Sequence, residues 1–115
     1  MTRPTLDVRF FKTESGAEPV RDWLKGLDVA DRKTLGEDIK TVQFGWPLGM
    51  PLVRKMAKDL WELRSHLLGR IARILFTVHD GTMILLHGFI KKAQQTPKDE
   101  LDLAQSRLGQ LRRLS

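Results

Sequence analysis

The first half of the chain has apolar residues at the spacing of one strand and two helices. Residues 6–12, LDVRFFK, are rich in β-forming side chains and predict an opening strand. From Pro19, apolar residues at i, i+3, i+4 and i+7 predict a short amphipathic helix whose first turn accommodates proline. A second helix is predicted from about Ala30, and the glycines and prolines of residues 44–51, FGWPLGMP, end it. The apolar faces of these helices are Val20, Trp23, Leu24 and Leu27, and Leu35, Ile39 and Val42.

The second half is dominated by strand patterns. Three strands are predicted at residues 59–64 (DLWELR), 70–80 (RIARILFTVHD) and 82–90 (TMILLHGFI). The dipeptide Asp80-Gly81 indicates a tight hairpin between the last two, because both residues tolerate a positive φ. Strands joined in this way form an antiparallel sheet.

A last helix is predicted from Thr96, which has the side chain of an N-cap. Pro97 then takes the first helical position, and Asp99 follows three residues after the cap. The predicted order is β-α-α-β-β-β-α, which is a small α+β domain with a two-helix hairpin on one side of an antiparallel sheet and a C-terminal helix. The apolar side of the last helix consists of Leu101, Ala104, Leu108 and Leu111.

Length and composition indicate a single domain, residues 1–115. Hydrophobic residues make up 41% of the chain and charged residues 30%, which is ordinary for a globular protein. Cysteine is absent, which excludes disulfides and thiolate zinc sites. The first ten residues lack the apolar run of a signal peptide, and no run is long enough to cross a membrane. We therefore expect a cytoplasmic protein without membrane contacts.

The excess of positive charge is confined to the second half. Residues 1–50 carry eight basic and eight acidic residues, whereas residues 51–115 carry twelve basic and six acidic, so the second half accounts for the whole net charge of +6. This segregation indicates an electropositive face that attracts phosphates or an acidic protein. Solvated surface lysines and arginines are the alternative.

Metal and cofactor chemistry is not indicated. The three histidines, His66, His79 and His87, are scattered and no HExxH motif is present. The chain has neither a P-loop nor a GxGxxG motif, and its serines lack a nucleophile-elbow context. His87 alternates with apolar residues, which favours a hydrogen-bonded, half-buried histidine over a catalytic one. We expect no metal and no cofactor.

Basic residues within the strands are the candidates for chemistry. Arg64 closes one strand, Arg73 lies in the middle of the next, and Lys91 ends the last. An arginine on an apolar strand costs free energy unless it meets an anion or opens to solvent. If the strands form one sheet, these three side chains could gather at one face or edge.

Such a cluster suits cleavage of RNA. The 2′-hydroxyl of RNA is the nucleophile, so the protein must orient the ribose, stabilise the phosphate and transfer protons. Arginine binds phosphate oxygens bidentately, and a lysine crowded by cations exchanges protons more readily. From spacing alone, however, ion pairs of Arg64 and Arg73 with Asp59 or Glu62 are the simpler interpretation.

Three segments together carry a family resemblance: DLWELR, GRIARILFTVHDG and ILLHGFIKKAQQTPKDELDLA. Over roughly residues 5–110 the chain resembles the HigB-type, phage-derived branch of the RelE/ParE toxin superfamily. The resemblance implies a microbial ribonuclease-like fold and a type II toxin that cuts messenger RNA, usually in the ribosomal A site, without a metal. It implies catalytic roles for Arg64, Arg73 and Lys91. RNA contacts are expected from Arg54, Lys55, Lys58, Arg70, Lys92 and Phe89.

The same resemblance implies a partner, a cognate helix-turn-helix antitoxin encoded beside the toxin. One departure concerns tyrosine, which many relatives place near the C-terminus and which this chain lacks. Stacking on a base would then fall to Phe89, Trp46 or His87, and the acid and base remain unassigned.

Two other functions stay open. The first is a ParE-like inhibitor that binds DNA gyrase and cuts nothing; it shares the fold but has no use for a catalytic cluster. The second is a basic nucleic-acid binder without activity, which the lack of aromatic residues among the basic segments disfavours.

Overall fold

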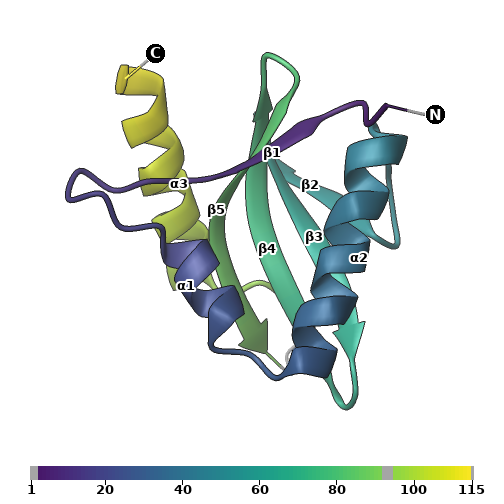
Figure 1. Cartoon of the computed structure of the whole chain (residues 1–115). Coiled ribbons are helices and arrows are strands. Elements are labelled where there is room, and N and C mark those ends of the chain that lie inside the picture. Colours follow the sequence, from purple (N-terminus) through teal and green to yellow (C-terminus); the bar gives the residue numbers. More distant parts are fainter. Residues whose placement is uncertain (1–2, 92–94, 115) are drawn as a thin grey trace.

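The computed structural model describes residues 3–91 and 95–114, which form a five-stranded sheet with helices on both faces (Figure 1). Within these residues the elements are β1 (Asp7–Phe10), α1 (Pro19–Lys25), α2 (Val29–Gly45), β2 (Val53–Ala57), β3 (Leu60–Leu67), β4 (Arg70–His79), β5 (Thr82–Lys91) and α3 (Lys98–Leu114). The strand order is β1-β5-β4-β3-β2. Strands β2 to β5 form an antiparallel meander, and β1 adds to β5 in parallel.

The predicted α+β class and the helix hairpin on one face are confirmed, but two details were wrong. The predicted order omitted β2. Its sequence, VRKMA, has two adjacent basic residues and no strand-like alternation, and its pairing with β3 is interrupted by a bulge between Lys55 and Ala57. The sheet was predicted to be antiparallel, whereas β1 pairs with β5 in parallel, from Asp7 opposite Thr82 onward. That pairing is set by residues far apart in sequence and leaves no local pattern.

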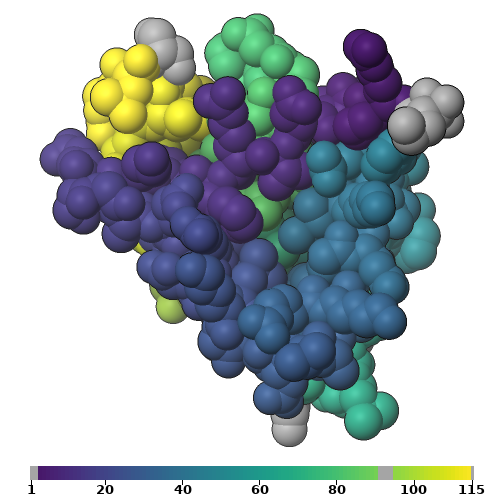
Figure 2. All heavy atoms as spheres, viewed as in Figure 1, coloured from purple at the N-terminus to yellow at the C-terminus, as the bar shows by residue number. Residues whose placement is uncertain are grey.

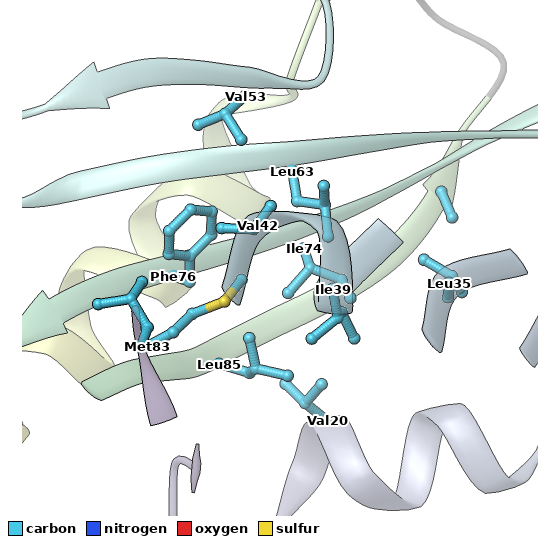
Figure 3. Packing of buried hydrophobic residues seen from close by; sticks show 12 residues of the cluster. Val20, Leu35, Ile39, Val42, Val53, Leu63, Ile74, Phe76, Met83 and Leu85 are labelled. Atoms are coloured by element: carbon cyan, nitrogen blue, oxygen red, sulfur yellow. The ribbon is translucent and has the colours of Figure 1, made fainter. Parts of the chain in front are cut away.

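Two hydrophobic cores hold the layers together, one on each face of the sheet. In Figure 2, α1 and α2 hide most of one sheet face, and the side chains beneath them form the larger core, shown in Figure 3. Helix α3 packs on the opposite face over a second core. The first core includes Val20, Leu35, Ile39, Val42, Leu63, Ile74, Phe76, Met83 and Leu85; the second consists of Phe11, Leu60, Leu75, Leu86, Phe89, Ala104 and Leu108.

The hairpin between β4 and β5 forms at the predicted dipeptide. Asp80 and Gly81 both have positive φ, 49° and 73°, the left-handed conformation that a two-residue turn between twisted strands requires. This turn sets the register of β4 on β5, and thereby decides which side chains of the two strands lie opposite each other.

Gly88 of β5 allows α1 to approach the sheet closely. A Cβ atom at this position would lie 2.5 Å from Cε3 of Trp23, so Gly88→Ala forces the indole ring to move. We expect the variant to lose about 1–3 kcal/mol of unfolding free energy, the usual cost of overpacking a core. The measurement is denaturant unfolding of the purified protein.

The matched control is Gly36→Ala in α2, where an added Cβ meets nothing within 4 Å. Alanine stabilises an exposed helix position by up to about 1 kcal/mol over glycine, so this variant should gain stability. Equal effects of the two substitutions would contradict the close packing at Gly88.

None of the helices in the described part of the chain combines the length and the apolar character that crossing a bilayer requires.

Candidate functional site

The strand register places Arg64 and Arg73 directly opposite each other on β3 and β4. Arg73 in turn lies opposite Phe89 on β5. All three share the sheet face on which Leu75 and Phe89 contact α3, because residues of equal parity point to one side. The structure therefore brings together two of the three predicted catalytic residues.

Glu62 lies between the two arginines and offsets their repulsion. Its Oε1 atom is 3.8 Å from Nη1 of Arg73 and 3.9 Å from Nε of Arg64. The side chains of Glu62 and Arg73 are each 1% exposed, whereas that of Arg64 is 14% exposed. Glu62 is thus the ion-pair partner that the spacing allowed, and the group is a buried carboxylate between two guanidinium groups.

Thr96 completes the group from the segment before α3. Nη1 of Arg73 donates a hydrogen bond of 3.0 Å to the Thr96 hydroxyl, which in turn donates to Oε2 of Glu62. The prediction of Thr96 as N-cap was wrong in this respect, since α3 begins at Lys98 and the hydroxyl is used by the buried pair instead. A hydrogen bond to a buried ion pair outweighs an exposed cap.

The burial of Arg73 affects its electrostatics. Desolvation lowers the pKa of Arg73; Glu62 opposes this effect, and the nearby positive charges of Arg64 and Arg54 add to it. An arginine nevertheless keeps its proton at neutral pH. Next to Arg73, Nε of Arg64 and Oε1 of Glu62 are buried without a hydrogen-bond partner. The ion-pair cluster therefore leaves part of its hydrogen-bonding capacity unused.

Exposure distinguishes the two arginines. Arg73 is covered, so direct contact with a phosphate would require the segment that carries Thr96 to move. Arg64 is 14% exposed and is therefore the member of the pair that a ligand reaches. It also borders a hollow of about 270 Å³ at the edge of β3, but α2 forms the other side of this hollow, on the sheet face opposite to the one from which the Arg64 side chain projects. The hollow is lined by Thr34, Asp38, Pro51, Leu52, Arg64 and His66.

The other predicted RNA-binding residues are dispersed. Arg54 is exposed and lies opposite Glu62 in the β2–β3 pairing, next to the arginine pair. Lys55 is exposed and lies opposite Trp61, on the face of the larger core, and Lys58 is exposed in the turn that follows β2. Of these three residues, Arg54 alone extends the charge of the pair along the same face.

Arg70 lies on the opposite face and serves the fold. Its Nη2 atom is 2.8 Å from Oδ2 of Asp31 in α2, which ties that helix to the sheet. Lys91 pairs through its backbone with Ile71 at the end of β5, and its side chain lies outside the described structure. The predicted contact of Lys92 also lies outside the described residues.

His87 is held through both ring nitrogens, and its ring stacks on Phe89 at 5.5 Å. Nη1 of Arg107 is 3.4 Å from Nδ1, and Oε1 of Glu100 is 3.2 Å from Nε2. Since arginine only donates, Nδ1 accepts, and a neutral ring then carries its proton on Nε2 toward Glu100. Burial lowers the pKa of Arg107, which also donates to the Leu86 carbonyl. This arrangement matches the predicted half-buried, hydrogen-bonded histidine.

Phe89 is part of the second core and is 7% exposed, so its ring is not open to stacking by an RNA base in this arrangement. Trp46 packs edge-on against Trp61 and Phe76 on the other face. Among residues 3–91 and 95–114, no three His, Asp or Glu side chains lie close enough together to hold a metal ion.

Sequence reasoning missed Thr96 and His66 as members or neighbours of the site. The parity of β3 was the available signal for His66, which lies two residues after Arg64 on the same face. No local pattern identifies Thr96, because its contacts span 23 and 34 residues.

Comparison with known families bears on what this site does. The family model Phage derived protein Gp49-like (DUF891) matches residues 22–109. The chain belongs to the Gp49-like family. No curated protein matches it. The Gp49-like region begins within α1, ends within α3 and contains Arg64, Arg73, Glu62 and Thr96.

Gp49-like proteins belong to the RelE/ParE-like toxin superfamily and are phage-derived and toxin-like. The resemblance found in the sequence is thereby confirmed at the level of the superfamily. A Gp49-like chain with a buried carboxylate between two arginines, one of them partly exposed, has the components expected of a phosphate-binding site.

Proposed function

We propose that the protein is the toxin of a type II toxin–antitoxin pair of the HigB kind, and that it cleaves messenger RNA on the ribosome. The observation that carries the proposal is the placement of Arg64 opposite Arg73, with the Arg64 side chain partly exposed, in a chain of a toxin-like family. Two adjacent guanidinium groups create the field that a phosphate needs as negative charge builds on it. The reaction belongs to the cytoplasm, where messages are translated.

The RNA supplies its own nucleophile in this reaction. The 2′-hydroxyl attacks the adjacent phosphorus, and Arg64 stabilises the two non-bridging oxygens through its planar guanidinium. Arg73 strengthens the field from behind, held by Glu62 and Thr96. Lys91, at the end of β5, is proposed to contribute charge or accept a proton. No step uses a cofactor.

Binding of the longer RNA relies on phosphate contacts around the pair. Arg54 lies beside it, and Lys55 and Lys58 are exposed in and after β2. Lys92 is proposed to act at the other edge. These charges attract the RNA backbone without reading its sequence, which suits an enzyme that takes its specificity from the ribosome.

A gyrase inhibitor of the ParE kind is the second candidate. Burial of Arg73 and its pairing with Glu62 and Thr96 favour it, because a fully enclosed ion pair also fits a structural role. A structural role alone does not account for the partial exposure of Arg64, which is why we prefer the ribonuclease.

The proposed partner is a helix-turn-helix antitoxin with acidic residues at its contact surface. The net charge of +6 and its position in residues 51–115 favour an acidic partner. Co-expression of such a protein from the neighbouring gene should restore growth.

Induced expression tests the function directly. We expect growth arrest and new RNA 5′ ends inside translated reading frames, mapped by end sequencing within minutes of induction. A translation-blocked message should remain intact, because the ribosome presents the substrate. Intact messages together with gyrase-linked DNA breaks would instead establish the inhibitor.

A further inference from the structure

His66 lies beside Arg64. The arginine pair can bind a phosphate but contains no group that transfers protons near neutral pH. His66 and Arg64 are separated by one position on β3, so their side chains leave the same face about 7 Å apart. Both also border the hollow of about 270 Å³ at the edge of β3, which α2 closes from the other side of the sheet. A phosphate bound by the Arg64 side chain on its own face of the sheet would therefore have His66 at its side.

The strand register shows which residues of β4 and β5 lie in line with His66. His66 lies opposite Ile71 on β4, which lies opposite Lys91 on β5. On this face of the sheet, the row of His66, Ile71 and Lys91 is the neighbour of the row of Arg64, Arg73 and Phe89. His66 therefore occupies the same end of the sheet as the three residues to which catalysis is attributed.

Of the three histidines, only His66 has an imidazole that is available within the site. The ring of His87 is occupied at both nitrogens. His79 lies at the far end of β4, beside Asp80 of the hairpin. His66 is exposed, and it forms no hydrogen bond or ion pair with another residue of the described ranges.

The remaining polar groups of the hollow have other roles. The Thr34 hydroxyl donates to the Ala30 carbonyl, and Asp38 accepts a hydrogen bond from Ser65. Arginine side chains bind anions but do not give up a proton in proteins. Histidine is the side chain that gives and takes protons near neutral pH. This end of β3 thus carries one residue suited to proton donation next to one suited to phosphate binding.

We propose that His66 is the general acid of the RNA cleavage, an assignment that rests on the proposed ribonuclease function. The 2′ oxygen forms a bond to phosphorus, and its proton passes to a base. The bond from phosphorus to the 5′ oxygen breaks, and the protonated imidazole of His66 gives that oxygen its proton. The products are a 2′,3′-cyclic phosphate and a 5′-hydroxyl, and His66 regains a proton from solvent.

A sulfur-substituted RNA tests this role. Two messages are compared on programmed ribosomes, one with ordinary linkages and one with sulfur in place of the bridging 5′ oxygen at the cut. A thiolate leaves without being protonated, so the second message needs no acid. His66→Ala is expected to cut the ordinary message about a hundredfold more slowly, the low end for loss of a general acid. It should cut the sulfur message at nearly the wild-type rate.

The matched control is His79→Ala, which removes an exposed histidine from the far end of β4 and should cut both messages as wild type does. If wild-type protein cuts neither message, the ribonuclease function falls and the role of His66 with it. If wild type cuts and His66→Ala cuts the ordinary message equally fast, only the role of His66 falls. Equal losses on both messages would also overturn it, because they would indicate phosphate binding or action as a base.

Discussion

Replacing Arg64 with alanine is expected to lower RNA cleavage by about a hundredfold or more, and induced cells should keep growing. Removal of one preorganised charge from a transition state typically costs about 3 kcal/mol in the barrier. The side chain is 14% exposed, and its nearest carboxylate oxygen is 3.9 Å away at Glu62. Its loss should therefore affect stability far less than activity. The measurements are growth after induction, the cleavage rate on programmed ribosomes and thermal melting.

Arg64→Lys tests whether cleavage depends on the positive charge of Arg64 alone or also on the planar shape of its guanidinium group. Lysine keeps the positive charge but loses the two-pronged guanidinium, so most of the activity should still be lost. The control is Arg21→Ala, which removes an exposed arginine of α1 on the opposite face and should remain toxic. A toxic, normally folded Arg64→Ala would remove this residue from the active site.

Replacing Arg73 with alanine is expected to destabilise the fold by about 3–5 kcal/mol, the cost of leaving a buried charge without its partner. Glu62, at 1% exposure, would keep its carboxylate in the interior with only Arg64, 3.9 Å away, and the Thr96 hydroxyl to offset its charge. Denaturant unfolding measures the loss. A toxicity assay on this variant alone would therefore confuse unfolding with loss of chemistry.

Two controls separate these effects. The exposed pair of Arg112 and Asp59, 3.0 Å apart, should contribute less than about 1 kcal/mol when Arg112 is replaced by alanine. Replacing Glu62 and Arg73 together with leucine should recover much of the stability, because no buried charge remains. If Arg73→Ala melts like wild type but no longer cleaves RNA, its guanidinium contacts the substrate and the buried arrangement does not represent the active form.

The elements with a strong local signal could be predicted from the sequence. The helix faces around Val20 and Leu35 and the hairpin at Asp80-Gly81 depend on neighbours within a few residues, and all are present. Strand β2 could not be found in this way. It is an edge strand of five residues with two adjacent basic side chains, and its apolar alternation is broken by the bulge after Lys55.

Of the candidate site, the sequence could predict only which strand residues share a face of the sheet. Parity placed Arg64 and Arg73 on one face, but it carries no information about what covers them. The burial of Arg73 depends on Thr96, and the removal of Arg70 from the site depends on Asp31, 39 residues away in sequence. Contacts of this range arise from the packing of helices on the sheet, which spacing along one strand does not encode.

The parallel pairing of β1 with β5 has a consequence for synthesis. Residues 7–10 leave the ribosome well before their hydrogen-bonding partners, residues 82–85. At translation rates of roughly 5–20 residues per second, the opening strand waits about 4–15 s for its partner. The edge of the sheet therefore closes only after residues 82–85 have been made and have left the ribosome.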